Sequence, residues 1–124
     1  MKRDEGASSP ALPRLVARAL ELGTRGADWQ SLRHGVDILR VCGNAESGPS
    51  VALLRYQPGA HVPAHRHLGF EVIYVLSGAQ SDERGTYGAG TLVVNREGDT
   101  HSVQSADGCL VLIMWERPIE FVGA

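Results

Sequence analysis

The sequence has little of what marks several classes of protein. Its 124 residues include two cysteines, Cys42 and Cys109, and a single lysine. Two cysteines so far apart supply neither a CxxC metal motif nor a disulfide framework. The 12 basic and 14 acidic residues give a net charge of -2, which does not indicate a nucleic-acid groove or a surface for anionic membranes.

Long apolar runs are also missing. No segment approaches the roughly 20 apolar residues that a membrane-spanning helix needs. The first residues, MKRDEGASSPALPR, lack the apolar stretch of a secretory signal. We therefore predict a cytoplasmic protein that binds neither membrane nor nucleic acid.

Short apolar segments, each ended by Gly, Pro, Asn or Asp, fill the chain from residue 35 onward. They are 36–42, 50–56, 70–76, 79–83, 91–95, 101–105 and 109–115. Strands spaced in this way are typical of an all-β sandwich or barrel. We predict one domain over 26–124, preceded by a partly flexible arm over 1–25. Within the arm, residues 14–22 fit a helix or a strand, and we favour a strand or irregular structure.

Histidines supply the clearest chemical signal. Four of the five, His61, His65, His67 and His101, fall within 41 residues, and imidazole is the commonest metal-binding side chain. His65 and His67 are two residues apart, which on a strand places them on one face about 6.6 Å apart. His61 shares this parity, but Pro63 interrupts the strand, so we favour a rim or surface position for it.

Glu71 follows His67 by four residues, about 13 Å on a straight strand. We therefore predict a hairpin loop over 68–70, with Gly69 at its centre, that makes the two residues cross-strand neighbours about 5 Å apart. Glu71 would then face an apolar interior, where an unpaired carboxylate is costly and a cation is its natural partner.

His101 follows the turn signal Gly98-Asp99 and must come from a distant strand. Three imidazoles and one carboxylate suit zinc, iron, manganese, nickel or cobalt rather than calcium. Four such ligands close a tetrahedral zinc site, but they leave two free positions on an octahedral metal.

These residues resemble the two motifs of the cupin superfamily. The first motif reads Gly59-x5-His65-x-His67-x3-Glu71-x6-Gly78, and the second reads Gly90-x5-Arg96-x-Gly98-x2-His101-x3-Ser105. In the second, Arg96 replaces the usual Pro and Ser105 the frequent Asn. The resemblance implies a six- to eight-stranded jelly-roll barrel that holds one divalent metal ion per chain through His65, His67, Glu71 and His101.

A narrower resemblance is to the cupin half of zinc-binding anti-sigma factors of the ChrR type. It rests on Trp29 and on the segments LLRYQPGAHVPAHRH, SDERGTYGAG and GDTHSVQSADGC. It implies a small-ligand-binding or regulatory metal module, with zinc favoured over iron, manganese or nickel. The alternative that it implies is a metal-dependent dioxygenase-like enzyme acting on a small ketone or aromatic substrate. Residues 1–41 lack the His-x3-Cys-x2-Cys motif of the anti-sigma half, so we expect no sigma-factor binding.

Several other side chains have a structural and a functional interpretation. The second face of the strand over 70–76 would also be apolar, because it carries Phe70, Val72, Tyr74 and Leu76. An apolar outer face favours a homodimer, although the N-terminal arm could cover it instead. Arg55 and Tyr87 could line the mouth of the barrel, but a structural role is favoured for both. Cys109 is expected in the core.

Overall fold

The computed structural model describes residues 14–24 and 28–123, so the first half of the predicted arm lies outside the described residues. The elements are α1 (Ala19–Thr24), β1 (Gln30–Arg33), β2 (Val36–Gly43), β3 (Ser50–Tyr56), β4 (Ala60–His67), β5 (Glu71–Asp82), β6 (Gly85–Gly88), β7 (Leu92–Asn95), β8 (Thr100–Ser105), β9 (Cys109–Trp115) and β10 (Ile119–Phe121). No helix in this part of the chain is long and apolar enough to cross a membrane.

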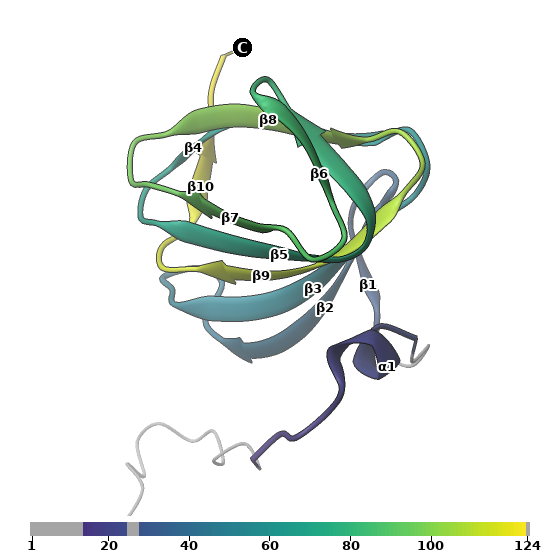
Figure 1. Ribbon diagram of the computed structural model, residues 1–124. Helices are drawn as coiled ribbons and strands as arrows, with labels where there is room; N and C mark the ends of the chain where they lie inside the picture. The colour runs from purple at the N-terminus through teal and green to yellow at the C-terminus, as the bar shows by residue number, and fades with distance from the viewer. Residues whose placement is uncertain (1–13, 25–27, 124) are drawn as a thin grey trace, which may run out of the picture.

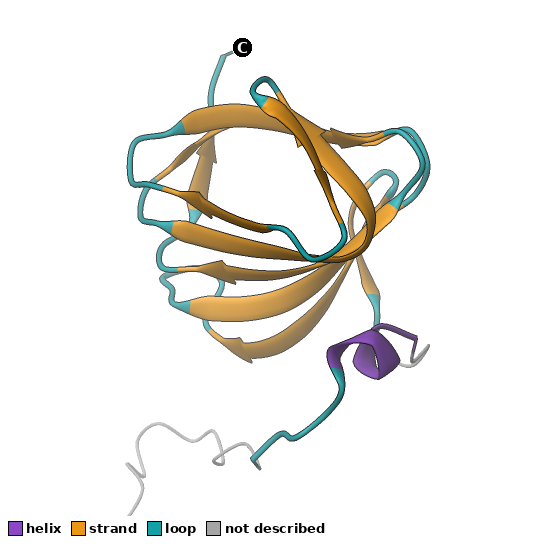
Figure 2. Cartoon of the chain, viewed as in Figure 1, coloured by secondary structure: helices purple, strands orange, loops and turns teal. Residues whose placement is uncertain are grey.

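The strands form a curled antiparallel barrel, which confirms the all-β jelly-roll prediction (Figures 1 and 2). Hydrogen bonding follows the order β1-β2-β3-β9-β5-β8-β4-β10, with β6 and β7 also paired to β5. Strand β5 pairs with β9 and β7 through its first half and with β6 and β8 through its second half. The predicted segments 70–76 and 79–83 are therefore parts of one long strand, which is irregular between Val75 and Ser77.

The core lies inside the barrel because the strands alternate apolar inward residues with polar or partly exposed outward ones. On β5, for example, Ile73 and Val75 are buried, whereas Tyr74 between them is exposed. Cys109 belongs to the same core, as predicted. Glu71, at the start of β5, belongs to the same inward-facing row. A carboxylate therefore occupies a position where the other residues of the row are apolar.

The preference for a strand or irregular structure over 14–22 was wrong in its second half, because residues from Ala19 onward form α1. Helix α1 lies on the outside of the barrel (Figure 1). Leu22 and Trp29 pack against the buried cluster of Leu39, Leu53 and Leu110. Gly23 permits the close approach, since a Cβ atom at this position would lie 2.4 Å from a methyl carbon of Leu110.

The predicted hairpin over 68–70 was also wrong. Strand β4 pairs with β8 and β10, whereas β5 starts by pairing with β9 and β7. The connection therefore crosses from one sheet to the other, and the two strands face each other across the barrel. His67 and Glu71 still meet, but through the interior rather than along a hydrogen-bonded ladder.

The outer face of β5 and β7 carries several exposed apolar side chains. In the register of this pair Tyr74 lies opposite Leu92, and Val72 lies opposite Val94. Tyr74, Leu92 and Val94 are 40%, 60% and 45% exposed. The predicted dimer would use this part of the face.

We expect Tyr74→Glu to convert a dimer into a monomer, because the substitution places a charge at the centre of an apolar interface. Light scattering would measure the mass of the wild type and the variant at tens of micromolar protein. Gln104→Glu, which adds a charge to an exposed position on β8, is the control and should remain dimeric. A monomeric wild type would contradict the prediction.

Candidate metal centre

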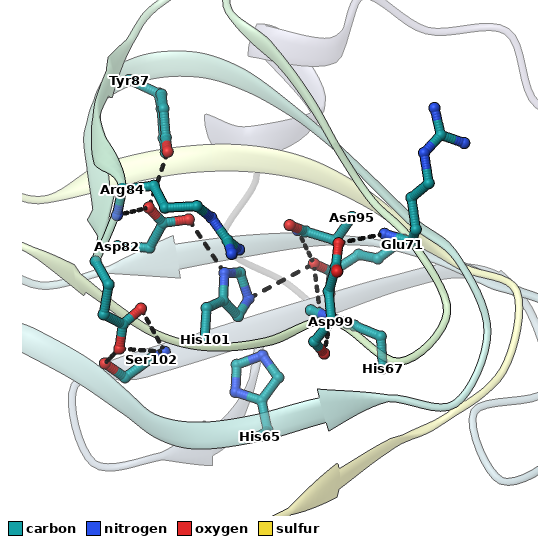
Figure 3. Close-up of polar contacts among 12 residues, drawn as sticks. His65, His67, Glu71, Asp82, Arg84, Tyr87, Asn95, Asp99, His101 and Ser102 are labelled. Atoms are coloured by element: carbon teal, nitrogen blue, oxygen red, sulfur yellow. Dashed lines mark hydrogen bonds and ion pairs between the residues drawn. The ribbon is translucent and has the colours of Figure 1, made fainter.

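Three imidazoles meet inside the barrel (Figure 3). His65 and His67 come from β4, and His101 comes from β8, where it lies directly opposite His65 in the register. All three side chains are buried. One ring nitrogen from each lies within 4.8 Å of the others, and three such groups at this separation could hold a metal ion.

The backbone fixes the orientation of the two β4 imidazoles. Nδ1 of His65 lies 2.8 Å from the carbonyl oxygen of Pro63, and Nδ1 of His67 lies 3.1 Å from that of Asp99. A carbonyl oxygen only accepts hydrogen bonds, so each Nδ1 carries a proton, and in the neutral imidazole this leaves the lone pair on Nε2. This neutral tautomer is the form in which histidine binds metals.

A carboxylate performs the same task for the third imidazole. Nδ1 of His101 lies 3.2 Å from Oδ2 of Asp82. The other oxygen of Asp82 accepts hydrogen bonds from the Tyr87 hydroxyl and from the backbone N–H of Arg84, each at 2.8 Å. Asp82 is thus held by the β5–β6 turn and orients His101 toward the other two rings.

Two nitrogens at this centre have no hydrogen-bond partner in the described structure. They are Nε2 of His67 and Nε2 of His101, both fully buried, and the polar group that lies near both is the Glu71 carboxylate. A buried polar atom without a partner typically costs about 1–3 kcal/mol, and such atoms are rare in native proteins. A metal ion would satisfy both lone pairs at once, so the residues present fit a bound transition metal.

Glu71 extends toward the imidazoles from the start of β5. Its Oε1 lies 3.0 Å from Nε2 of His67 and 3.9 Å from Nε2 of His101. The amide of Asn95 donates to Oε1 at 2.9 Å, and the indole N–H of Trp115 donates to Oε2 at 2.7 Å. Both donors lie directly opposite Glu71 in the strand register, on β7 and β9.

These contacts decide the charge of the site. Burial alone would raise the pKa of the Glu71 carboxyl, but the contacts with His67, His101 and Asn95 outweigh burial and lower this pKa. Glu71 is therefore ionised at neutral pH. Burial lowers the pKa of His65, which keeps that imidazole neutral. For His67 the neighbouring carboxylate outweighs burial and raises the pKa.

A cavity of about 310 Å³ adjoins the imidazoles, with His65, His101 and Glu71 in its wall. Most of the wall is aliphatic or aromatic, including Ile38, Leu54, Val62, Ile73, Val103, Ile113 and Phe121. The volume and the apolar lining are typical of a site for a small molecule.

The structure thus brings together all four residues that the sequence singled out as ligands, whose role as ligands stays a prediction. The other residues considered from the sequence, which are His61, Arg55 and Tyr87, do not join this cluster. His61 is exposed, as favoured. Arg55 pairs with Asp37 at 2.9 Å and stacks on Trp29, and neither Arg55 nor Tyr87 lines the cavity beside the imidazoles.

Sequence reasoning missed the side chains that position these four residues. They are Asp82, Asn95 and Trp115. A signal for Trp115 was present, because it shares the inward parity of Val111 and Ile113 on β9. Asn95 carried a similar signal, because it shares the parity of Val93 on β7, whereas the contact of Asp82 with His101 depends on strands distant in the sequence.

A jelly-roll barrel whose interior presents two histidines and a glutamate from the first motif and one histidine from the second defines a cupin. The chain belongs to the ChrR cupin-like family: residues 19–118 match the model described as ChrR Cupin-like domain.

The relatives include proteins with different recorded roles. The anti-sigma-E factor ChrR of Cereibacter sphaeroides is 32% identical over 123 residues, which cover 97% of this chain and 54% of that protein. This chain thus spans about half the length of that relative. The crystal structure of Rhodobacter sphaeroides SigE in complex with the anti-sigma ChrR matches 90% of this chain and 63% of that chain, with 27% identity and a TM-score of 0.68.

The fold also occurs in an enzyme. The crystal structure of an acetylacetone dioxygenase from Acinetobacter johnsonii matches 93% of this chain and 82% of that chain, with a TM-score of 0.75 and 12% identity. At this identity the similarity concerns the fold alone.

We expect Asp82→Asn to weaken zinc binding roughly 10- to 100-fold, the usual effect of removing a group that orients a metal-binding histidine. The asparagine amide could donate to Nδ1 of His101 and so favour the wrong tautomer. A chelator competition titration would measure the affinity. Asp37→Asn, which removes a carboxylate from the ion pair with Arg55 outside the site, should bind zinc like the wild type. Unchanged affinity in a folded Asp82→Asn protein would contradict the assignment.

Proposed function

We propose that this chain is a metal-binding regulatory or small-ligand-binding module that holds one divalent transition metal ion. The ligands are His65, His67, His101 and Glu71. The main support is the convergence of three buried imidazoles, with one ring nitrogen from each within 4.8 Å of the others. Neutral imidazoles with one carboxylate favour zinc, with iron, manganese or nickel as alternatives.

Polar side chains in the cavity wall could bind a ligand beside the metal centre. The cavity wall contains Tyr56 and Gln80 beside the proposed ligands. Burial, followed by the charges of Cys109 and Glu71, raises the pKa of Tyr56 far above its usual value. Tyr56 therefore stays protonated at neutral pH and can donate a hydrogen bond but cannot serve as a general base. A bound metal would supply a Lewis-acidic centre, and the cavity would admit a small ligand next to it.

The remaining expectations about context stay predictions. The boundary of the arm at residue 25, the cytoplasmic location and the lack of sigma-factor binding belong to this group. Sigma-factor binding is a recorded property of the relative whose complex with SigE was solved, and this chain covers 63% of that relative.

We expect the purified protein to contain near-stoichiometric metal when it is produced with zinc and iron supplements. His65→Ala and His101→Ala should lose most of it, because each removes one of four ligands. His61→Ala, which changes an exposed histidine, should retain it. Elemental analysis would measure the content. Metal should also stabilise the folded state, by about 2.7 kcal/mol when free metal is 100 times Kd. A wild type without metal would contradict the proposal.

A second candidate function is a metal-dependent dioxygenase-like enzyme. The observation that favours it is the cavity itself, which reaches His65, His101 and Glu71 and could seat a small, mostly apolar substrate beside the metal. In this function Glu71 and the imidazoles hold the ion, and the apolar wall positions the substrate and excludes water.

Oxygen uptake by the iron-loaded protein with β-diketones and hydroxylated aryl ketones would test this second function. Uptake that requires substrate and is abolished by Glu71→Ala would establish it. His61→Ala should leave the rate unchanged and serves as the control. Metal binding without oxygen uptake across the series favours the non-catalytic function.

A further inference from the structure

The barrel has a seam between β1 and β10 that no backbone ladder closes in the described structure. The path of paired strands ends at β1 on one side and at β10 on the other. Side chains meet there instead: the guanidinium carbon of Arg33 on β1 lies 5.4 Å from the ring centroid of Phe121 on β10. The Phe121 ring is in turn 6.1 Å from the ring of His65. The seam therefore lies beside the proposed metal centre.

Charge in the adjoining cavity is unbalanced. Its wall includes two cations, Arg33 and Arg40, and a single carboxylate, Glu71. The oxygens of Glu71 already receive hydrogen bonds from Asn95 and Trp115. Arg33 is only partly exposed. None of the salt bridges in the described part of the chain involves it.

An arginine in an apolar wall without an acidic partner has a specific chemical preference. Its planar guanidinium matches a carboxylate through two parallel hydrogen bonds, which a neutral group cannot reproduce. The aromatic face of Phe121 can hold the guanidinium in place through a cation–π contact, which leaves its N–H groups available to a ligand.

We infer that Arg33 binds the carboxylate of a small organic acid whose apolar body occupies the cavity next to the metal centre. This inference rests on the proposed function, since it specifies the class of ligand for the same site. The ligand would enter through the β1–β10 seam. Separation of the Arg33 and Phe121 side chains would open a path there without breaking backbone hydrogen bonds between strands.

The test compares phenylacetate with phenylacetamide, which has nearly the same shape but no charge. Both would be titrated into the zinc-loaded protein and followed by NMR. We expect the carboxylate to bind at least about tenfold more tightly, as charge-assisted hydrogen bonds are stronger than neutral ones. Arg33→Gln should remove this preference. Arg96→Gln, which removes an exposed arginine outside the cavity, should preserve it.

A further variant separates ligand binding from closure of the seam. Phe121→Leu removes the cation–π contact but keeps Arg33, so the preference for phenylacetate should persist. Equal preference in wild type and Arg33→Gln, or no binding of phenylacetate at millimolar concentration, would overturn the inference. Zinc content is measured on every protein. If Arg33→Gln is zinc-loaded and keeps the preference for phenylacetate, the result contradicts this inference alone. A wild type that binds no zinc contradicts the proposed function.

Discussion

The burial of the Glu71 carboxylate inside an apolar barrel is the constraint on which the site depends. Removing an ionised carboxylate from water costs several kcal/mol unless partners replace the lost hydration. The fold supplies Asn95 and Trp115 as donors from the two strands paired with β5, and His67 as a neighbour from the opposite sheet. Because these partners come from different strands, the charge of Glu71 and the pairing of the sheet are mutually dependent.

Much of this arrangement could be predicted from residue spacing. The short apolar segments separated by turn residues identified the barrel, and the separation of His65 and His67 by two residues placed both on one face of a strand. The position of Glu71 in the inward row of Ile73 and Val75 identified it as a carboxylate in need of a partner. These features are local, since each depends only on the side-chain period of one strand.

The errors arose where contacts across the sheet decide the structure. The loop over 68–70 has the length and glycine of a hairpin, but its strands belong to opposite sheets, and only pairing with β8, β9 and β10 reveals this. Residues 14–22 fit a helix or a strand by pattern alone, and the part from Ala19 onward forms α1. Asp82 reaches His101 through the long continuation of β5, which the sequence divided into two strands.

The strands that border the seam are edge strands, which in principle can pair with strands of other chains. β1 has four residues and β10 has three, so each offers few free backbone N–H and C=O groups along its outer edge. Short edge strands are a common protection against edge-to-edge aggregation. The seam proposed as the ligand entrance therefore lies between two edge strands that are too short to pair stably with a strand of another chain.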